Sequence, residues 1–168
     1  MPGGISDIMS GETDQKDLLI LGLGNSVLGD DRVGLEVARM VFERLPSGTA
    51  SFSEASVGGI ELLHVLEGYQ RVVIVDALKP GRLAPGDVQE ISALELQSHY
   101  SPMTPHNAGL FTALDFGRAC GLCMPIEVRV FGIGVEDPFS FSEECTPVVA
   151  DAIPKAVDLI YQAIFLRN

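Results

Sequence analysis

The sequence contains no tryptophan, three cysteines, and only 11 lysines and arginines among its 168 residues. So few basic residues, set against 23 aspartates and glutamates, exclude the basic face that a nucleic-acid-binding protein uses to neutralise phosphates. An odd, sparse set of cysteines argues against a secreted disulfide framework and favours a reducing compartment. No segment approaches the roughly 20 apolar residues that cross a bilayer, and the polar N-terminus does not resemble a signal peptide. We therefore expect a cytoplasmic protein that binds neither nucleic acid nor membrane.

What the sequence does have is enough apolar material for a core, because 46% of its residues are hydrophobic. Its length suits one compact domain. Residues 1–16 are polar and rich in glycine and serine, so we expect a flexible N-terminal tail there and a single domain over 17–168.

Short apolar runs alternate with segments of helical periodicity. Leu18–Leu21 and Val72–Val75 are typical of strands buried on both faces, and apolar residues recur at helical spacing over 33–45. Further strands are expected at about 50–56 and 126–131, and further helices at about 60–67, 107–119 and 148–166. The segment 87–91 is reached through Pro-Gly turns without room for a crossover helix, so its strand should be antiparallel. This alternation predicts an α/β fold, a three-layer α/β/α sandwich on a mainly parallel sheet.

Three chemically competent side chains follow elements that meet at one edge of such a sheet. Asp31 lies in the loop after the first strand, Asp76 ends the third strand, and His106 precedes a later helix. Ligands bind outside the carboxyl ends of the strands where the strand order reverses, so these side chains converge if the first and third strands are neighbours. Two carboxylates and an imidazole suit a borderline divalent metal such as nickel or zinc, with positions left open for a substrate.

Each of these residues also has an ordinary structural interpretation. Asp30 and Asp31 could cap the helix that begins near residue 32, and for Asp30 we favour that interpretation. Asp76 could be a turn residue and His106 a loop histidine, with His99 the second candidate for the imidazole ligand. Only the combination of the three indicates a site.

Two other motifs suggest cofactors that we do not expect. Gly22 and Gly24 begin a dinucleotide fingerprint, but Val27 stands where its third glycine belongs. The phosphate-loop spacing that ends at Gly29 is followed by two carboxylates, which would repel phosphate, so no nucleotide should bind. The pair Cys120 and Cys123 ends a helix instead of starting one, which indicates a glycine-capped C-terminus and not a redox site.

Several short motifs occur in a fixed order along residues 17–165. They are Leu21-Gly22-Leu23-Gly24-Asn25 with Gly29-Asp30-Asp31-x-x-Gly34, then Gly58-Gly59-Ile60-Glu61-Leu62-Leu63, Val73-Ile74-Val75-Asp76-Ala77 with Pro85-Gly86, and Pro105-His106-Asn107-x-Gly109-Leu110. Taken together, this ordered set resembles the hydrogenase maturation endopeptidases. The resemblance implies a five-stranded sheet with one antiparallel strand.

The resemblance also implies a function. Family members cleave the C-terminal extension from the large-subunit precursor of a nickel–iron hydrogenase after nickel insertion. It assigns Asp31, Asp76 and His106 as metal ligands, although some members have glutamate at the first position. It further implies aspartyl-type endopeptidase activity with Asp31 and Asp76 as catalytic residues, and a substrate-binding loop at Gly58 and Gly59. The nickel would be carried by the precursor, with other divalent metals as substitutes.

A different class of protein, a phospho-acceptor receiver domain, also has an acidic pair after its first strand and an aspartate at the end of its third. That class places a lysine after the last strand, where this chain has Gly132-Ile133-Gly134. We keep the receiver domain as the alternative to the endopeptidase.

Overall fold

The computed structural model describes residues 16–56, 59–92 and 110–165. In chain order its elements are β1 (Lys16–Leu23), the 3-10 helix η1 (Asp30–Arg32), α1 (Val33–Arg44), β2 (Ser51–Ala55), the 3-10 helix η2 (Gly59–Leu62), α2 (Leu63–Leu66), β3 (Tyr69–Leu78), β4 (Val88–Ile91), α4 (Leu110–Ala119), β5 (Glu127–Gly134) and α5 (Pro147–Phe165). The expected tail falls on residues 1–15, outside this description, except that Lys16 already belongs to β1.

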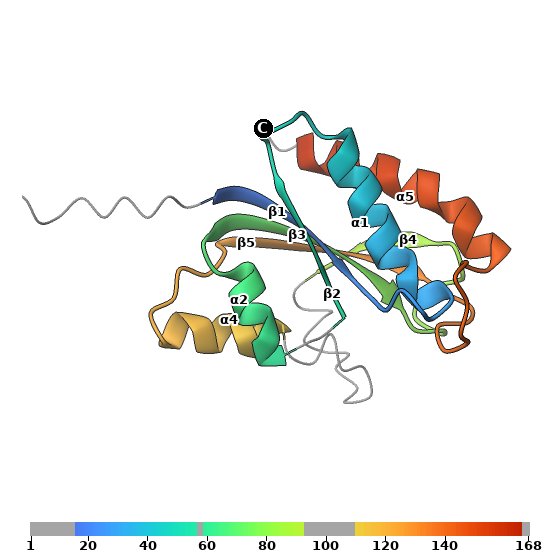
Figure 1. Ribbon diagram of the computed structural model, residues 1–168, viewed down its shortest axis with the longest axis horizontal. Coiled ribbons are helices and arrows are strands. Elements are labelled where there is room, and N and C mark those ends of the chain that lie inside the picture. The colour runs from blue at the N-terminus through green and yellow to red at the C-terminus, as the bar shows by residue number, and fades with distance from the viewer. Residues whose placement is uncertain (1–15, 57–58, 93–109, 166–168) are drawn as a thin grey trace, which may run out of the picture.

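The five strands form one sheet in the order β2-β1-β3-β5-β4. All neighbouring strands are parallel except β4, which runs antiparallel to β5 with Val88 opposite Ile133. Helices α1 and α5 cover one face of the sheet, and α2 and α4 cover the other (Figure 1). The predicted three-layer sandwich and its single antiparallel strand are confirmed.

The β-branched run of β3 contributes to both layers of the core, because successive side chains of a strand point to opposite faces. Ile74 packs in the cluster with α2 and α4, whereas Val73 and Val75 pack in the cluster with α1 and α5. The central strands are therefore buried on both faces, which is why they are continuous apolar runs in the sequence.

Strand β3 continues two residues past Asp76, where the sequence suggested its end. Ala77 and Leu78 remain paired with Ile133 and Gly134 of β5, and this register carries the strand further. In the ranges given above, no helix combines the length and the apolar character needed to cross a bilayer.

The two-cysteine motif ends α4 as predicted. Gly121 has a φ of 76°, a conformation that favours glycine. The N–H of Leu122 donates to the carbonyl of Gly117 at 2.9 Å, and the N–H of Gly121 donates to Arg118 at 3.0 Å. These two bonds close the helix in a Schellman motif. Cys120 and Cys123 are both free and exposed.

Candidate active site

Strands β1 and β3 are adjacent at the centre of the sheet, and the chain leaves them in opposite directions, toward β2 and toward β5. The carboxyl ends of β1 and β3 therefore mark the point where the strand order reverses, which is where α/β sheets bind ligands. Asp31 lies in η1 directly after the β1 loop, and Asp76 lies near the end of β3. The structure thus brings these two aspartates to the predicted edge.

Glycine makes the close approach of α1 to this edge possible. A side-chain carbon at Gly34 would lie 2.3 Å from the carbonyl oxygen of Leu23 and 2.7 Å from that of Val75. The same carbon would lie 3.1 Å from Cα of Asp76, so the first turn of α1 rests against β3 at the aspartate. Because real side chains cannot approach backbone so closely, only glycine allows this packing.

The loop after β1 is shaped by a second close contact. Gly24 has a φ of 147°, and a side-chain carbon there would lie 2.1 Å from the carbonyl oxygen of Asp31. Gly24 and Gly34 together fold the loop back so that η1 packs onto the ends of β1 and β3. Gly24, which belongs to a nucleotide-like motif in the sequence, therefore has a different role here and packs against Asp31.

Asp76 is almost fully buried, with 3% of its surface exposed, and directly follows the apolar run 72–75 of β3. It pairs with Gly132 across the β3–β5 ladder. A carboxylate is rarely buried to this degree unless it interacts with other polar groups, and Asp76 does have such an interaction within the protein. Its position at the ligand-binding edge makes it a candidate for the site.

Asp30 does not cap the following helix, and that expectation is wrong. It is fully buried, and the N-cap residues of η1 and α1 form no side-chain capping bond. Its Oδ2 accepts hydrogen bonds from the N–H groups of Glu136 at 2.9 Å and Asp137 at 2.8 Å. Thr146, which precedes α5, donates its N–H to Oδ1 at 2.7 Å and its hydroxyl to Oδ2 at 3.0 Å. Asp30 therefore ties the β1 loop to the segment between β5 and α5.

The β5–α5 segment is ordered by its own carboxylate at Asp137. Its Oδ1 accepts from the N–H groups of Phe139 at 3.3 Å and Ser140 at 3.1 Å, an Asx-type turn. Three hydrogen bonds lower the pKa of the Asp137 carboxyl. The side chain of Ser140 has the largest effect, followed by the backbone N–H groups of Ser140 and Phe139. The charged form is the one that holds the turn.

Cys145 is the thiol nearest to this region, because its Sγ lies 3.7 Å from the carbonyl oxygen of Gly29. Burial, followed by the negative charges of Glu36 and Asp30, raises the pKa of Cys145 to about 12. Its thiolate is therefore scarce at neutral pH, and Cys145 is a poor nucleophile.

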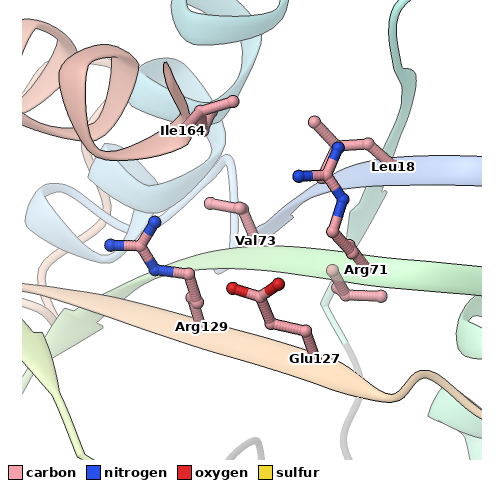
Figure 2. A pocket seen from close by; sticks show the side chains of 7 residues that line it. Leu18, Arg71, Val73, Glu127, Arg129 and Ile164 are labelled. Carbon is pink, nitrogen blue, oxygen red and sulfur yellow. The ribbon is translucent and has the colours of Figure 1, made fainter. Parts of the chain in front are cut away.

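Two hollows differ in size and position. One of about 230 Å³ opens at the carboxyl ends of β1 and β2 and is lined by Gly24, Asn25, Ser26, Leu35, Glu54, Ala55 and Ser56. The other, about 30 Å³, lies at the amino end of the sheet, where Arg71, Glu127 and Arg129 extend from β3 and β5 beside Ile164 (Figure 2). Arg129 is paired with Glu90 at 2.8 Å and Arg71 with Asp17 at 3.3 Å, so the small hollow is held by structural ion pairs. The larger hollow is lined by Gly24, which packs against the backbone of Asp31, but neither Asp31 nor Asp76 lines it.

The remaining predicted site residues, His106 and Gly58, lie outside the described residues, as does the alternative ligand His99. Gly59 is described at the start of η2, with a φ of 68°. Among described residues, no three histidine, cysteine, aspartate or glutamate side chains group closely enough to hold a metal ion. Of the three predicted metal ligands, Asp31 and Asp76 belong to the described residues.

A three-layer α/β fold with two aspartates at its switch point is found in more than one class of protein, and comparison with known proteins identifies the family. A family model described as hydrogenase maturation protease (HycI) matches residues 37–163. The chain belongs to this family of hydrolases that cleave peptide bonds during hydrogenase maturation.

Individual relatives agree with this assignment. The hydrogenase 2 maturation protease of Escherichia coli K12 is 25% identical over 150 residues, which cover 88% of this chain and 90% of that protein. The solved structure of the hydrogenase maturating endopeptidase HybD from E. coli has the same fold, with a TM-score of 0.76, 23% identity and coverage of 88% and 91%. A hydrogenase 2 maturation peptidase from a Thaumarchaeota archaeon is 29% identical with a TM-score of 0.61, covering 90% of this chain and all of that one (100%). The receiver-domain alternative is therefore wrong.

Proposed function

We propose that this enzyme removes the C-terminal extension from the large-subunit precursor of a nickel–iron hydrogenase once nickel has been inserted. The nickel ion belongs to the precursor and is recognised by Asp31, Asp76 and His106. The observation that carries the proposal is the buried carboxylate of Asp76 at the ligand-binding edge, with the Asp31 segment packed against it through Gly34.

The residue types suit that metal. Carboxylate and imidazole ligands accept nickel and zinc, and three protein ligands leave coordination positions for groups of the substrate. Other divalent metals of similar preference would substitute for nickel. Recognition through a substrate-borne metal makes cleavage conditional on completed metal insertion.

Hydrolysis requires a base that takes a proton from the attacking water. Asp31 or Asp76 fills this role, which makes the enzyme an aspartyl-type endopeptidase. The water adds its oxygen to the scissile carbonyl carbon, and its proton passes through the carboxylate to the nitrogen of the departing extension. A metal ion beside the carbonyl polarises it and favours this attack. Covalent catalysis by cysteine is disfavoured, because Cys145 has a pKa raised to about 12 and Cys120 and Cys123 lie at the end of α4.

The larger hollow is a candidate binding site for the substrate peptide. It opens beside Gly24 and Ser56, and Ser56 lies two residues before Gly58 in the sequence. Glycine lets a substrate backbone approach closely, so this loop and the hollow together would hold the extension. Because the three cysteines are few and free, we place the reaction in the cytoplasm.

The decisive experiment mixes the purified enzyme with nickel-loaded and nickel-free precursor and follows the mass of each by mass spectrometry. Only the loaded precursor should be shortened. His106→Ala should reduce the cleavage rate at least 100-fold, whereas His64→Ala, which changes an exposed histidine on α2, should leave it unchanged. Circular dichroism checks that both variants remain folded. Equal processing of loaded and nickel-free precursor would reject the metal-gated mechanism.

A further inference from the structure

Large apolar side chains are exposed on the two segments that frame the proposed active site. Phe141 is 87% exposed and Phe139 67% exposed, both in the segment between β5 and α5. Val27, in the loop after β1, is 53% exposed. Exposed aromatic residues that gather in one region of a protein surface mark interaction sites more often than chance.

These two segments are joined by backbone hydrogen bonds. The N–H of Gly29 donates to the carbonyl of Ser140 at 2.9 Å, and the N–H of Ser142 donates to that of Val27 at 3.2 Å. Leu28 and Phe141 face each other in an antiparallel bridge. Figure 1 shows the segments side by side at the carboxyl end of the central strands. We call Val27, Phe139 and Phe141, together with these segments, the aromatic rim.

The rim is held in position before any partner arrives. Asp137 fixes the turn that carries Phe139, and Asn25 accepts a hydrogen bond from the N–H of Val27 at 3.1 Å. The buried carboxylate of Asp30, in the first segment, accepts a hydrogen bond from Asp137 in the second, and Asp31 is the next residue in the chain. A rim ordered in this way loses little conformational entropy on binding, and its position relative to Asp31 is set.

We propose that the aromatic rim is the docking surface for the folded body of the hydrogenase precursor, an inference that rests on the proposed function. Three exposed carboxylates, Glu136, Glu143 and Glu144, belong to the rim segment, and the ammonium of Lys79 lies 5.8 Å from the centre of the Phe139 ring. The matching surface on the precursor is therefore an apolar patch surrounded by lysine and arginine. A second copy of this chain fits worse, since the same carboxylates would face one another across a self-interface.

Docking on this surface would orient the substrate relative to the two aspartates. In the proposed function, the extension to be removed and the nickel to be recognised belong to one precursor. Docking the subunit on the rim brings both to Asp31 and Asp76 in one orientation, which converts a bimolecular search into a local one. The rim should therefore act on substrate binding and leave the chemical step unchanged.

The test measures KM and kcat for nickel-loaded precursor with the double variant Phe139→Ser/Phe141→Ser. We expect KM to rise at least tenfold and kcat to change less than twofold. The matched control is Ile126→Ser, which removes a side chain of similar exposure, 82%, at the amino end of β5. Unchanged KM in the double variant would overturn the proposal. If the double variant is unstable, Phe141→Ser alone, at the most exposed position, should still raise KM at least threefold.

Direct binding separates this proposal from the proposed function. Immobilised nickel-loaded precursor should retain the wild type and the Ile126→Ser variant but lose the rim variant, whether or not cleavage follows. If the three proteins bind as expected but the wild type does not cleave the precursor, only the proposed function is contradicted. Equal binding by all three proteins would overturn the rim proposal. Sedimentation that shows a wild-type dimer and a rim-variant monomer, with unchanged precursor binding, would instead assign the rim to self-association.

Discussion

The adjacent carboxylates of Asp30 and Asp31 have different roles, one structural and one at the candidate site. Asp30 is fully buried and accepts four hydrogen bonds from Glu136, Asp137 and Thr146. Asp31 is partly exposed and lies toward the ligand-binding edge beside Gly24. Asp30 thus holds the scaffold, and its neighbour Asp31 lies at the candidate site.

Replacing Asp30 by asparagine separates these tasks. The amide turns its NH₂ toward donors that need an acceptor, so at least one buried N–H loses its partner. We expect a loss of about 3 kcal/mol in the free energy of unfolding, measured by chemical denaturation. Asp31→Asn should cost less than about 1 kcal/mol but lower the cleavage rate at least 100-fold. A stable Asp30→Asn variant, or an active Asp31→Asn variant, would refute this division.

The role of Asp30 could not be predicted from the sequence. A carboxylate before a helix is most often a cap, and every partner that Asp30 actually binds lies more than 100 residues further along the chain. No local pattern distinguishes an anchor of that kind from a cap.

Helix α1 reaches the active-site edge because Gly34 lets its first turn rest on backbone. The atoms that crowd this position are carbonyl oxygens of Leu23 and Val75, which cannot move without disturbing β1 and β3. The other helical glycine, Gly117 in α4, is crowded by the side-chain ends of Met124 and Leu63, which can turn away. The same substitution at the two sites should therefore have different results.

Gly34→Ala should lower the free energy of unfolding by roughly 1–3 kcal/mol, because overpacking against backbone forces the helix outward. Since Asp31 moves with that helix, cleavage should fall at least tenfold even at temperatures where the variant is folded. Gly117→Ala should cost less, because the helix preference of alanine, about 1 kcal/mol, offsets the crowding of flexible side chains. Thermal denaturation and the precursor assay measure both effects. Equal losses at the two glycines would contradict the backbone argument.

Much of the architecture could be predicted, because its signals are local. The apolar run at 72–75 and the helical spacing at 33–45 each depend on neighbours within a few residues. The antiparallel β4 followed from the short connection after β3. The extension of β3 to Leu78 could not be predicted, since it depends on pairing with β5 more than 50 residues later. Convergence of Asp31 and Asp76 required the assumption that β1 and β3 are neighbours, which the strand order supports.

The two core layers share one sheet, so the fold should unfold as a unit. Leu62 is fully buried beneath α2 and α4, and Ile160 is fully buried in α5 on the opposite face. Both layers pack on β1 and β3, and losing either layer exposes the same strands to water. Destabilising one layer should therefore lower the stability of the other.

Leu62→Ala and Ile160→Ala should each lower the free energy of unfolding by roughly 2–5 kcal/mol, the usual cost of a cavity in a packed core. Because the two side chains lie on opposite faces of the sheet and share no contact cluster, the effects should add to within about 0.5 kcal/mol in the double variant. Met40→Ala, at a position 43% exposed on α1, is the control and should change stability by less than about 0.5 kcal/mol. Circular dichroism and tyrosine fluorescence should report one coincident denaturation transition in every variant. Separate transitions would mean that the two helical layers unfold independently. The stability of the α1–α5 layer would then not affect the sheet edge where Asp31 and Asp76 lie.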